Sequence, residues 1–218
     1  EPLSFDKFYG IAKVVGCKIN DLLLSCVAGA FREELMAAGK NVEGKHIHIT
    51  LPVNIRSEDE MDAGGVPEEL GNYFGTVFVP LPVGIENPLE RVYKIKHDMI
   101  ALKQSLQPAL SYGILYAAGL MPTGIQKTVL ESFGNKTSAV LSNVPGPKNT
   151  LYWNGAKLEG MYPISIPIDR VALNITLISY VDQLEFGLTA CRKSVPSMQR
   201  LLKFVEIALD ELEEVAGV

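Results

Sequence analysis

Apolar residues recur at helical spacing near the start of the chain and again at its end. Residues 5–15 follow Ser4 and precede Gly16, a pattern typical of a helix with a polar N-cap and a glycine stop. A longer helix is predicted to start at Asn20 as N-cap, with the carboxylate of Asp21 at its positive end, and to finish before Gly39. Pro196 is predicted to begin the last helix.

Alternation with a period of two predicts the strands. The expected strands are 46–53, 73–81 and 137–141, a hairpin at 151–158 and a second hairpin formed by 171–181 and 183–190. Asn154-Gly155 supplies the residues that a type I′ turn requires. Helices are expected at 89–106 and after Pro108 and Pro122. The predicted class is therefore α/β, with a mixed, largely antiparallel sheet packed with helices and an antiparallel meander in the second half.

Composition is typical of one globular domain. The chain has 218 residues, enough for one sizeable core, and we expect residues 1–218 to form a single domain. Hydrophobic residues make up 47% of the chain and charged residues 21%, which argues against a disordered protein. The net charge of −5 and the lack of any basic run argue against nucleic-acid binding.

The cysteines and the apolar runs bear on location. Three cysteines cannot all pair, which fits a reducing compartment, and no signal peptide opens the sequence, so a cytoplasmic protein is expected. The longest apolar stretch, 109–121, is interrupted by Gly113 and Gly119 and is shorter than the roughly 18 residues of a membrane span. It could pack in the core, bury against a partner or touch a bilayer. Because the sequence begins at Glu1 without a methionine, a fragment or processed piece is expected.

A polar pair follows the predicted strand 137–141. Ser142 and Asn143 stand directly before the turn Val144-Pro145-Gly146-Pro147, in which proline removes backbone donors. A strand that stops here would leave a hydroxyl, an amide and main-chain N–H groups at the rim of the sheet, where binding sites are often built. The alternative is a tight turn in which both side chains only satisfy local backbone.

Other candidate groups are fewer. Arg56 closes the segment Pro52-Val53-Asn54-Ile55-Arg56 at the end of the strand 46–53. It could clamp a phosphate or carboxylate, or pair with the acidic residues 58–60, and Asn72 lies at the mouth of the next strand. His46 and His48 share a strand face, but nothing nearby completes a metal site. His97-Asp98 is not a dyad, because adjacent helical residues do not face each other. No metal is therefore expected.

An ordered set of motifs runs through the whole chain. It comprises I-N-D from Ile19, P-V-N-I-R from Pro52, L-G-N from Leu70, L-S-N-V-P-G-P from Leu141, Y-P-I-S from Tyr162 and A-L-N-I-T from Ala172. These motifs resemble the C-terminal domain of the bacterial wax ester synthase/diacylglycerol acyltransferase family. The resemblance implies a CoA-dependent acyltransferase-like fold. It also implies that the chain is the C-terminal half of a two-domain enzyme, whose catalytic N-terminal half, absent here, carries the motif H-H-x-x-x-D-G.

The resemblance also implies a function. Such enzymes transfer a fatty acyl group from acyl-CoA, a substrate rather than a bound cofactor, to a long-chain alcohol or diacylglycerol. This chain has no H-H-x-x-x-D-G motif, so it is expected to be nearly inactive alone. By analogy, Ser142 or Asn143 would donate to the oxyanion. Asn20, Asp21 and Asn174 are expected to hold the active-site residues in place without touching the substrate. Substrate contacts are expected of Arg56, Asn72, Pro145 and Gly146.

Two alternatives remain open. The chain could be a non-catalytic acyl-CoA or lipid-binding module, or a related condensation or alcohol acyltransferase domain. Asp169-Arg170 and Cys191-Arg192 depart from the family pattern and leave substrate preference undecided, whereas Ser197, in place of an expected aspartate, can still cap the last helix. Contact with a membrane surface or lipid droplet is a further expectation, since mean hydropathy is +0.16.

Overall fold

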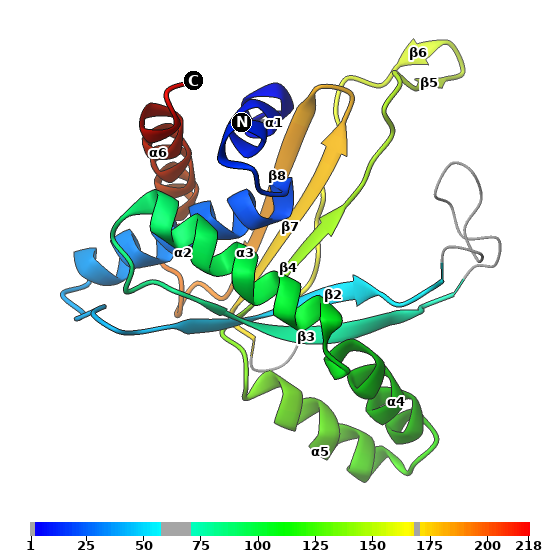
Figure 1. Cartoon of the computed structure of the whole chain (residues 1–218). Coiled ribbons are helices and arrows are strands. Elements are labelled where there is room, and N and C mark those ends of the chain that lie inside the picture. The colour runs from blue at the N-terminus through cyan, green and yellow to red at the C-terminus, as the bar shows by residue number, and fades with distance from the viewer. Residues whose placement is uncertain (1–2, 58–70, 168–170) are drawn as a thin grey trace.

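A six-stranded mixed sheet forms the centre of the protein (Figure 1). The computed structural model describes residues 3–57, 71–167 and 171–218. Within them the helices are α1 (Phe5–Val15), α2 (Ile19–Ala37), α3 (Pro88–Gln104), α4 (Gln107–Gly119), α5 (Thr123–Gly134) and α6 (Met198–Ala216). The strands are β1 (Leu3–Ser4), β2 (Ile47–Asn54), β3 (Phe74–Leu81), β4 (Ala139–Val144), β5 (Tyr152–Trp153), β6 (Ala156–Lys157), β7 (Leu173–Tyr180) and β8 (Gln183–Ala190).

The strand order is β1-β8-β7-β4-β2-β3, and β5 and β6 form a separate small hairpin. The pairs β1–β8, β7–β8 and β2–β3 are antiparallel, which confirms the predicted mixed, largely antiparallel sheet. The predicted meander in the second half is wrong, because β4 lies between β2 and β7 and runs parallel to both. Parallel pairing joins strands that are distant in sequence and leaves no turn signal to recognise.

One face of the sheet is buried under α1, α2, α3 and α6 (Figure 1). Alternate residues of β4 and β7, such as Leu141, Ile175 and Leu177, point to this face and are at most 2% exposed. Helix α2 lies deepest, since residues 22–24 and 26–28 are at most 1% exposed. Each fully buried leucine contributes about 1.5–3 kcal/mol, so α2 is the main helix of the core.

Most predicted helix ends are confirmed. Ser4 Oγ accepts a hydrogen bond from the N–H of Lys7 at 3.2 Å, and Gly16 closes α1 with a φ of 70°. Ser197 Oγ accepts from the N–H of Arg200 at 3.2 Å, so α6 begins at Met198, two residues after the predicted start. The predicted cap of α2 is wrong, because the helix already begins at Ile19.

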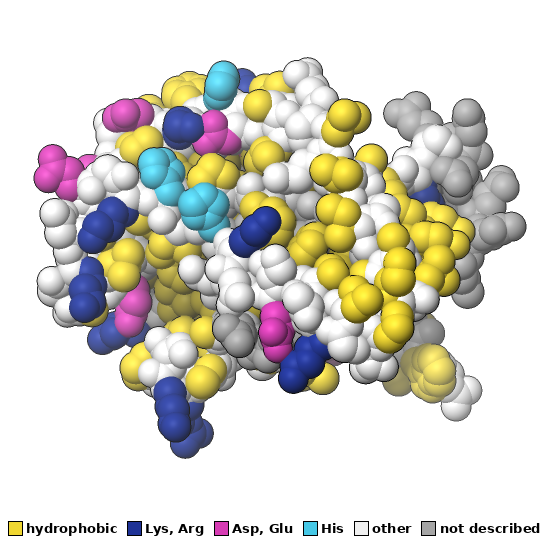
Figure 2. All heavy atoms as spheres, turned by 90° about the horizontal axis from the view of Figure 1, so that it is seen from below, with side chains coloured by type: hydrophobic (Ala, Val, Ile, Leu, Met, Phe, Trp, Pro, Cys, Tyr) yellow, Lys and Arg dark blue, Asp and Glu magenta, His cyan; other side chains and the backbone are white. Residues whose placement is uncertain are grey.

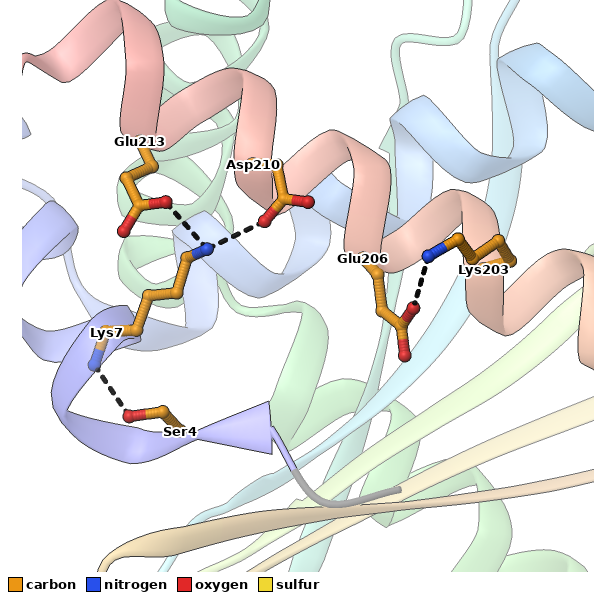
Figure 3. A network of polar contacts seen from close by, with 6 residues as sticks. All are labelled: Ser4, Lys7, Lys203, Glu206, Asp210 and Glu213. Atoms are coloured by element: carbon orange, nitrogen blue, oxygen red, sulfur yellow. Dashed lines mark hydrogen bonds and ion pairs between the residues drawn. The ribbon is translucent and has the colours of Figure 1, made fainter.

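The two ends of the described chain are joined by ion pairs between α1 and α6 (Figure 3). Lys7 Nζ lies 2.7 Å from a carboxylate oxygen of Asp210 and 2.7 Å from one of Glu213. Lys203 and Glu206 form a further pair along α6 at 3.2 Å. These contacts are partly exposed, so each contributes up to about 1 kcal/mol to folding stability. The buried apolar side chains of α6 contribute more.

Both hairpins have the expected turns. Asn154 and Gly155 have φ values of 47° and 86°, as a type I′ turn requires, and Val181 turns between β7 and β8 with a φ of 55°. The strand predicted at 137–141 instead extends from Ala139 to Val144. Ser142 and Asn143 therefore lie within the strand and not beyond its end.

Helices α4 and α5 lie on the opposite side of the sheet from the core helices (Figure 1). Helix α4 packs on β3 through Pro108 and Ser111, but most of its apolar side chains are exposed, so core packing does not explain the stretch 109–121. In the described part of the chain, no single helix has the length and hydropathy needed to cross a membrane. Helices α1 and α2 reach those values only as a pair, across a bend of 100°.

Candidate functional site

A groove of about 680 Å³ opens on the sheet face that the core helices leave uncovered. Its walls come from β2, β3, β4, β7 and the segment before β7. The lining includes the predicted site residues Ser142, Asn143, Asn174, Arg56 and Asn72, together with Thr50, Pro52, Asn54, Gly71, Tyr73, Phe74, Thr76, Val140, Val144, Ser165 and Thr176. The fold therefore gathers five of the nine predicted site residues in one place.

The groove exists because β2 and β4 separate. They pair only at Ile49–Ala139 and Thr50–Val140, whereas β4 continues beside β7 as far as Val144. The N–H of Ser138, the residue before β4, donates to the carbonyl of His48 at 2.8 Å at the paired end of the two strands. Beyond Thr50 and Val140 the strands part, and Val140, Ser142 and Val144 line the opening.

Ser142 and Asn143 point to opposite faces of β4. The amide nitrogen of Asn143 donates to Asn20 Oδ1 at 2.5 Å, which ties β4 to the first turn of α2. Asp21 accepts a hydrogen bond from the N–H of Lys18 at 3.1 Å and holds the same turn. Asn20 therefore supports β4 from the core side, whereas Ser142 lies on the groove face with Asn174 and Thr176.

A short polar network borders Ser142. The hydroxyl of Thr176 lies 2.5 Å from that of Ser165 and 3.3 Å from Asn174 Oδ1, and Thr176 and Asn174 are each 7% exposed. Among the described residues no partner accepts or donates a hydrogen bond at the Ser142 hydroxyl, so it can turn towards a ligand. Sequence reasoning missed Ser165 and Thr176, although the alternation of β7 puts Thr176 on the same face as Asn174.

Arg56 brings positive charge to the mouth of the groove. Its Nη2 donates to the carbonyl of Gly71 at 2.7 Å, and its guanidinium carbon lies 4.8 Å from the ring centroid of Tyr73. Pairing with residues 58–60 falls outside the described residues. The geometry leaves the planar guanidinium beside an aromatic wall, an arrangement that suits a phosphate or carboxylate at the entrance.

Pro145 and Gly146 lie past the groove lining. The N–H of Gly146 donates to Ser179 Oγ at 3.1 Å, and a Cβ added at Gly146 would lie 1.8 Å from the carbonyl oxygen of Ser179. This close approach explains the glycine by packing against β7. Substrate contact through these two residues stays a prediction.

Among the described residues, the groove lining contains no imidazole and no thiol. His97 is a surface residue, as predicted, since its side chain is 83% exposed. Burial raises the pKa of the Cys17 thiol to about 11 and that of Cys26 to about 12, so neither is a nucleophile at neutral pH. In residues 3–57, 71–167 and 171–218, no three His, Cys, Asp or Glu side chains are grouped so that they could hold a metal ion.

Known proteins resemble both the sequence and the fold. A family model described as "WS/DGAT C-terminal domain" matches residues 70–213. The chain is 35% identical to "O-acyltransferase WSD" of Acinetobacter baylyi, covering 100% of this chain and 46% of that protein. It is 34% identical to "Probable diacyglycerol O-acyltransferase tgs2" of Mycobacterium tuberculosis, covering 99% of this chain and 47% of that one. The chain thus spans about half the length of these curated relatives.

Solved structures agree. The wax ester synthase/diacylglycerol acyltransferase of Marinobacter aquaeolei VT8 superposes with a TM-score of 0.76 at 34% identity, over 100% of this chain and 48% of that one. The epimerization domain of tyrocidine synthetase B has a TM-score of 0.63 at 14% identity, which shows a shared fold alone. The chain belongs to the family of wax ester synthase/diacylglycerol acyltransferase C-terminal domains.

Proposed function

We propose that this chain is the C-terminal domain of an O-acyltransferase that transfers a fatty acyl group from acyl-CoA to a long-chain alcohol or diacylglycerol. The observation that carries the proposal is the position of Ser142 in the groove. There β4 has parted from β2 but still pairs with β7, and the Ser142 hydroxyl, with no partner among the described residues, borders a largely apolar space. The names of the relatives agree with this reaction class.

The Ser142 hydroxyl acts on the charge that forms during transfer. When the acceptor hydroxyl attacks the thioester carbonyl, the carbonyl oxygen becomes an oxyanion, and the Ser142 hydroxyl is placed to donate a hydrogen bond to it. One such donor is typically worth ~2.7–4 kcal/mol of transition-state stabilisation. The intermediate then collapses, the carbon–sulfur bond breaks, and the proton from the acceptor passes to the CoA thiolate.

The acceptor hydroxyl must lose its proton to a general base, and the described residues of the groove lining supply no imidazole for this role. A positioned general base typically contributes about 10²–10⁴-fold. We therefore propose that an N-terminal domain with the motif H-H-x-x-x-D-G provides an imidazole across the groove. Tyr162, Ile164 and Ile166 are 76–84% exposed at alternate positions beside the groove, and contact with such a domain would bury them. The isolated chain is expected to be nearly inert.

The groove also fits the proposed substrates. Its apolar residues, among them Pro52, Phe74 and Val140, suit a methylene chain, and Arg56 suits a phosphate of CoA at the entrance. Acyl-CoA enters and leaves as a substrate, so no resident cofactor is proposed. The acceptors are poorly soluble in water, and we therefore place the enzyme in the cytoplasm at a lipid surface.

The test is ester formation by the full-length protein. Release of CoA thiol and product analysis should show ester from a fatty acyl-CoA with a fatty alcohol or with diacylglycerol, and the isolated chain should show nearly none. Tight acyl-CoA binding without any ester from the folded full-length protein would instead support a non-catalytic binding module. Faster transfer to amines than to alcohols would support a condensation-type enzyme.

A further inference from the structure

The largest feature that the groove does not explain is the apolar surface of the α4–α5 hairpin, residues 106–134. Figure 2 views this underside of the molecule, where hydrophobic side chains gather over α4 and α5. Large apolar side chains on both helices and the turn between them are between 47% and 81% exposed: Leu106, Leu110, Tyr116, Leu120, Met121 and Leu130. In a soluble domain a contiguous apolar surface of this kind marks a site of interaction.

The charge around this surface is unusual for the chain. Residues 106–121 contain no Asp, Glu, Lys or Arg. The residues from 103 to 138 contain Lys103, Lys127 and Lys136 against Glu131 alone, three positive charges and one negative, which gives +2 in a chain whose net charge is −5. An uncharged centre bordered by lysines complements hydrocarbon beneath anionic headgroups.

The surface also continues into the groove. Tyr73 lines the groove, its ring centroid lies 6.1 Å from that of Tyr112, and the Tyr112 ring lies 6.2 Å from that of Tyr116 on the same helix. Tyrosine rings with one polar end are well suited to the boundary between lipid and water. A row of aromatic side chains therefore leads from exposed α4 to the groove that Ser142 lines.

We propose that the α4–α5 hairpin docks the protein on an anionic lipid surface, and that a lipid acceptor passes from there along Tyr116, Tyr112 and Tyr73 into the groove. A protein partner is less well matched, because protein interfaces normally carry polar groups that form direct hydrogen bonds, and 106–121 offers few. The route of the acceptor rests on the proposed function, whereas the docking itself does not.

Vesicle flotation of the full-length protein tests the docking. Phosphatidylcholine vesicles containing phosphatidylglycerol should bind the wild type. Leu110→Glu and Leu120→Glu should each lower the partition coefficient about tenfold or more, because each puts a charge where a methylene chain was buried. Val14→Glu on α1 is the matched control, since Val14 is apolar and 59% exposed but distant from the hairpin, and it should bind normally. Thermal melting checks that all variants are folded.

The results separate the docking from the reaction. Vesicle binding unchanged by both hairpin substitutions, or no binding by the wild type, would overturn the proposal. It would also be overturned if these substitutions dissociated an oligomer and left flotation unaltered, because the surface would then join two copies. Activity on vesicle-embedded diacylglycerol relative to a dissolved short-chain alcohol should fall in the hairpin variants. Hairpin-dependent flotation of a protein that acylates no acceptor would support the docking and refute only the reaction.

Discussion

Ser142 and Asn143 are adjacent in sequence but should respond to substitution in different ways. Ser142→Ala removes a groove-facing hydroxyl with no partner among the described residues, so we expect kcat to fall by about 10²–10³. The free energy of unfolding should change by less than about 0.5 kcal/mol. Asn143→Ala instead leaves Asn20 Oδ1 without its donor at 2.5 Å, and we expect unfolding free energy to fall by roughly 1–2 kcal/mol.

Two assays on the full-length protein distinguish these roles. Steady-state release of CoA thiol measures kcat, and urea unfolding measures stability. A double-mutant cycle with Asn20→Ala should give a coupling of about 0.5–1.5 kcal/mol between the two asparagines. The reasoning is refuted if Asn143→Ala loses as much turnover as Ser142→Ala at unchanged stability. It is equally refuted if Ser142→Ala melts earlier but turns over normally.

Three further predictions concern packing and pH. Gly75→Ala would place a Cβ 2.1 Å from a backbone carbonyl of α4, so calorimetry should show destabilisation by about 1–3 kcal/mol, whereas Gly124→Ala, with open space around it, should not destabilise in this way. Gly29→Ala would place a Cβ 2.8 Å from Nη2 of the buried Arg91 and should lower stability in urea unfolding. Adding Arg91→Met should restore part of that stability, because it removes the crowding together with two guanidinium nitrogens that have no hydrogen-bond partner among the described residues. Burial raises the pKa of Cys17 from 9.0 to about 11, so the unfolded state binds fewer protons than the folded state between these values; stability should therefore fall as pH rises through this window, and Cys17→Ser should reduce the fall.

Local sequence signals predicted local structure well. The caps Ser4 and Gly16 and the turn Asn154-Gly155 were recognised because each needs only its own few residues to define a conformation. The start of α2 was misplaced because Asn20 is a good cap by type, yet its side chain is engaged by Asn143, 123 positions away. A long-range contact therefore overrides the local preference.

Long-range structure could not be predicted in the same way. No local signal in residues 139–144 predicts that this strand lies parallel to two neighbours, because packing in the core and not a turn determines its partners. The apolar stretch 109–121 matches a core helix in composition, and only its position outside the main layer leaves it exposed. Periodicity identifies a helix but not what covers it.

The site was predicted in part. The motifs pointed to the groove side of β4, but the strand was expected to end before Ser142, so the alternation that separates Ser142 from Asn143 was not applied. Had the strand been extended to Val144, its period of two would have put the two side chains on opposite faces. The groove itself depends on where β2 leaves β4, which is a property of the whole sheet.

The pairing of β1 with β8 has a consequence for biosynthesis. Leu3 lies opposite Leu184, and α1 is held to α6 by Lys7, so the segment that contains β1 and α1 completes its contacts only when β8 and α6 have been made. Contacts of such long separation slow folding, and the apolar side of α2 stays uncovered until α6 arrives. Translation that stopped before Met198 would yield a nascent chain dependent on chaperones, with its groove strands present but its hydrophobic layer open.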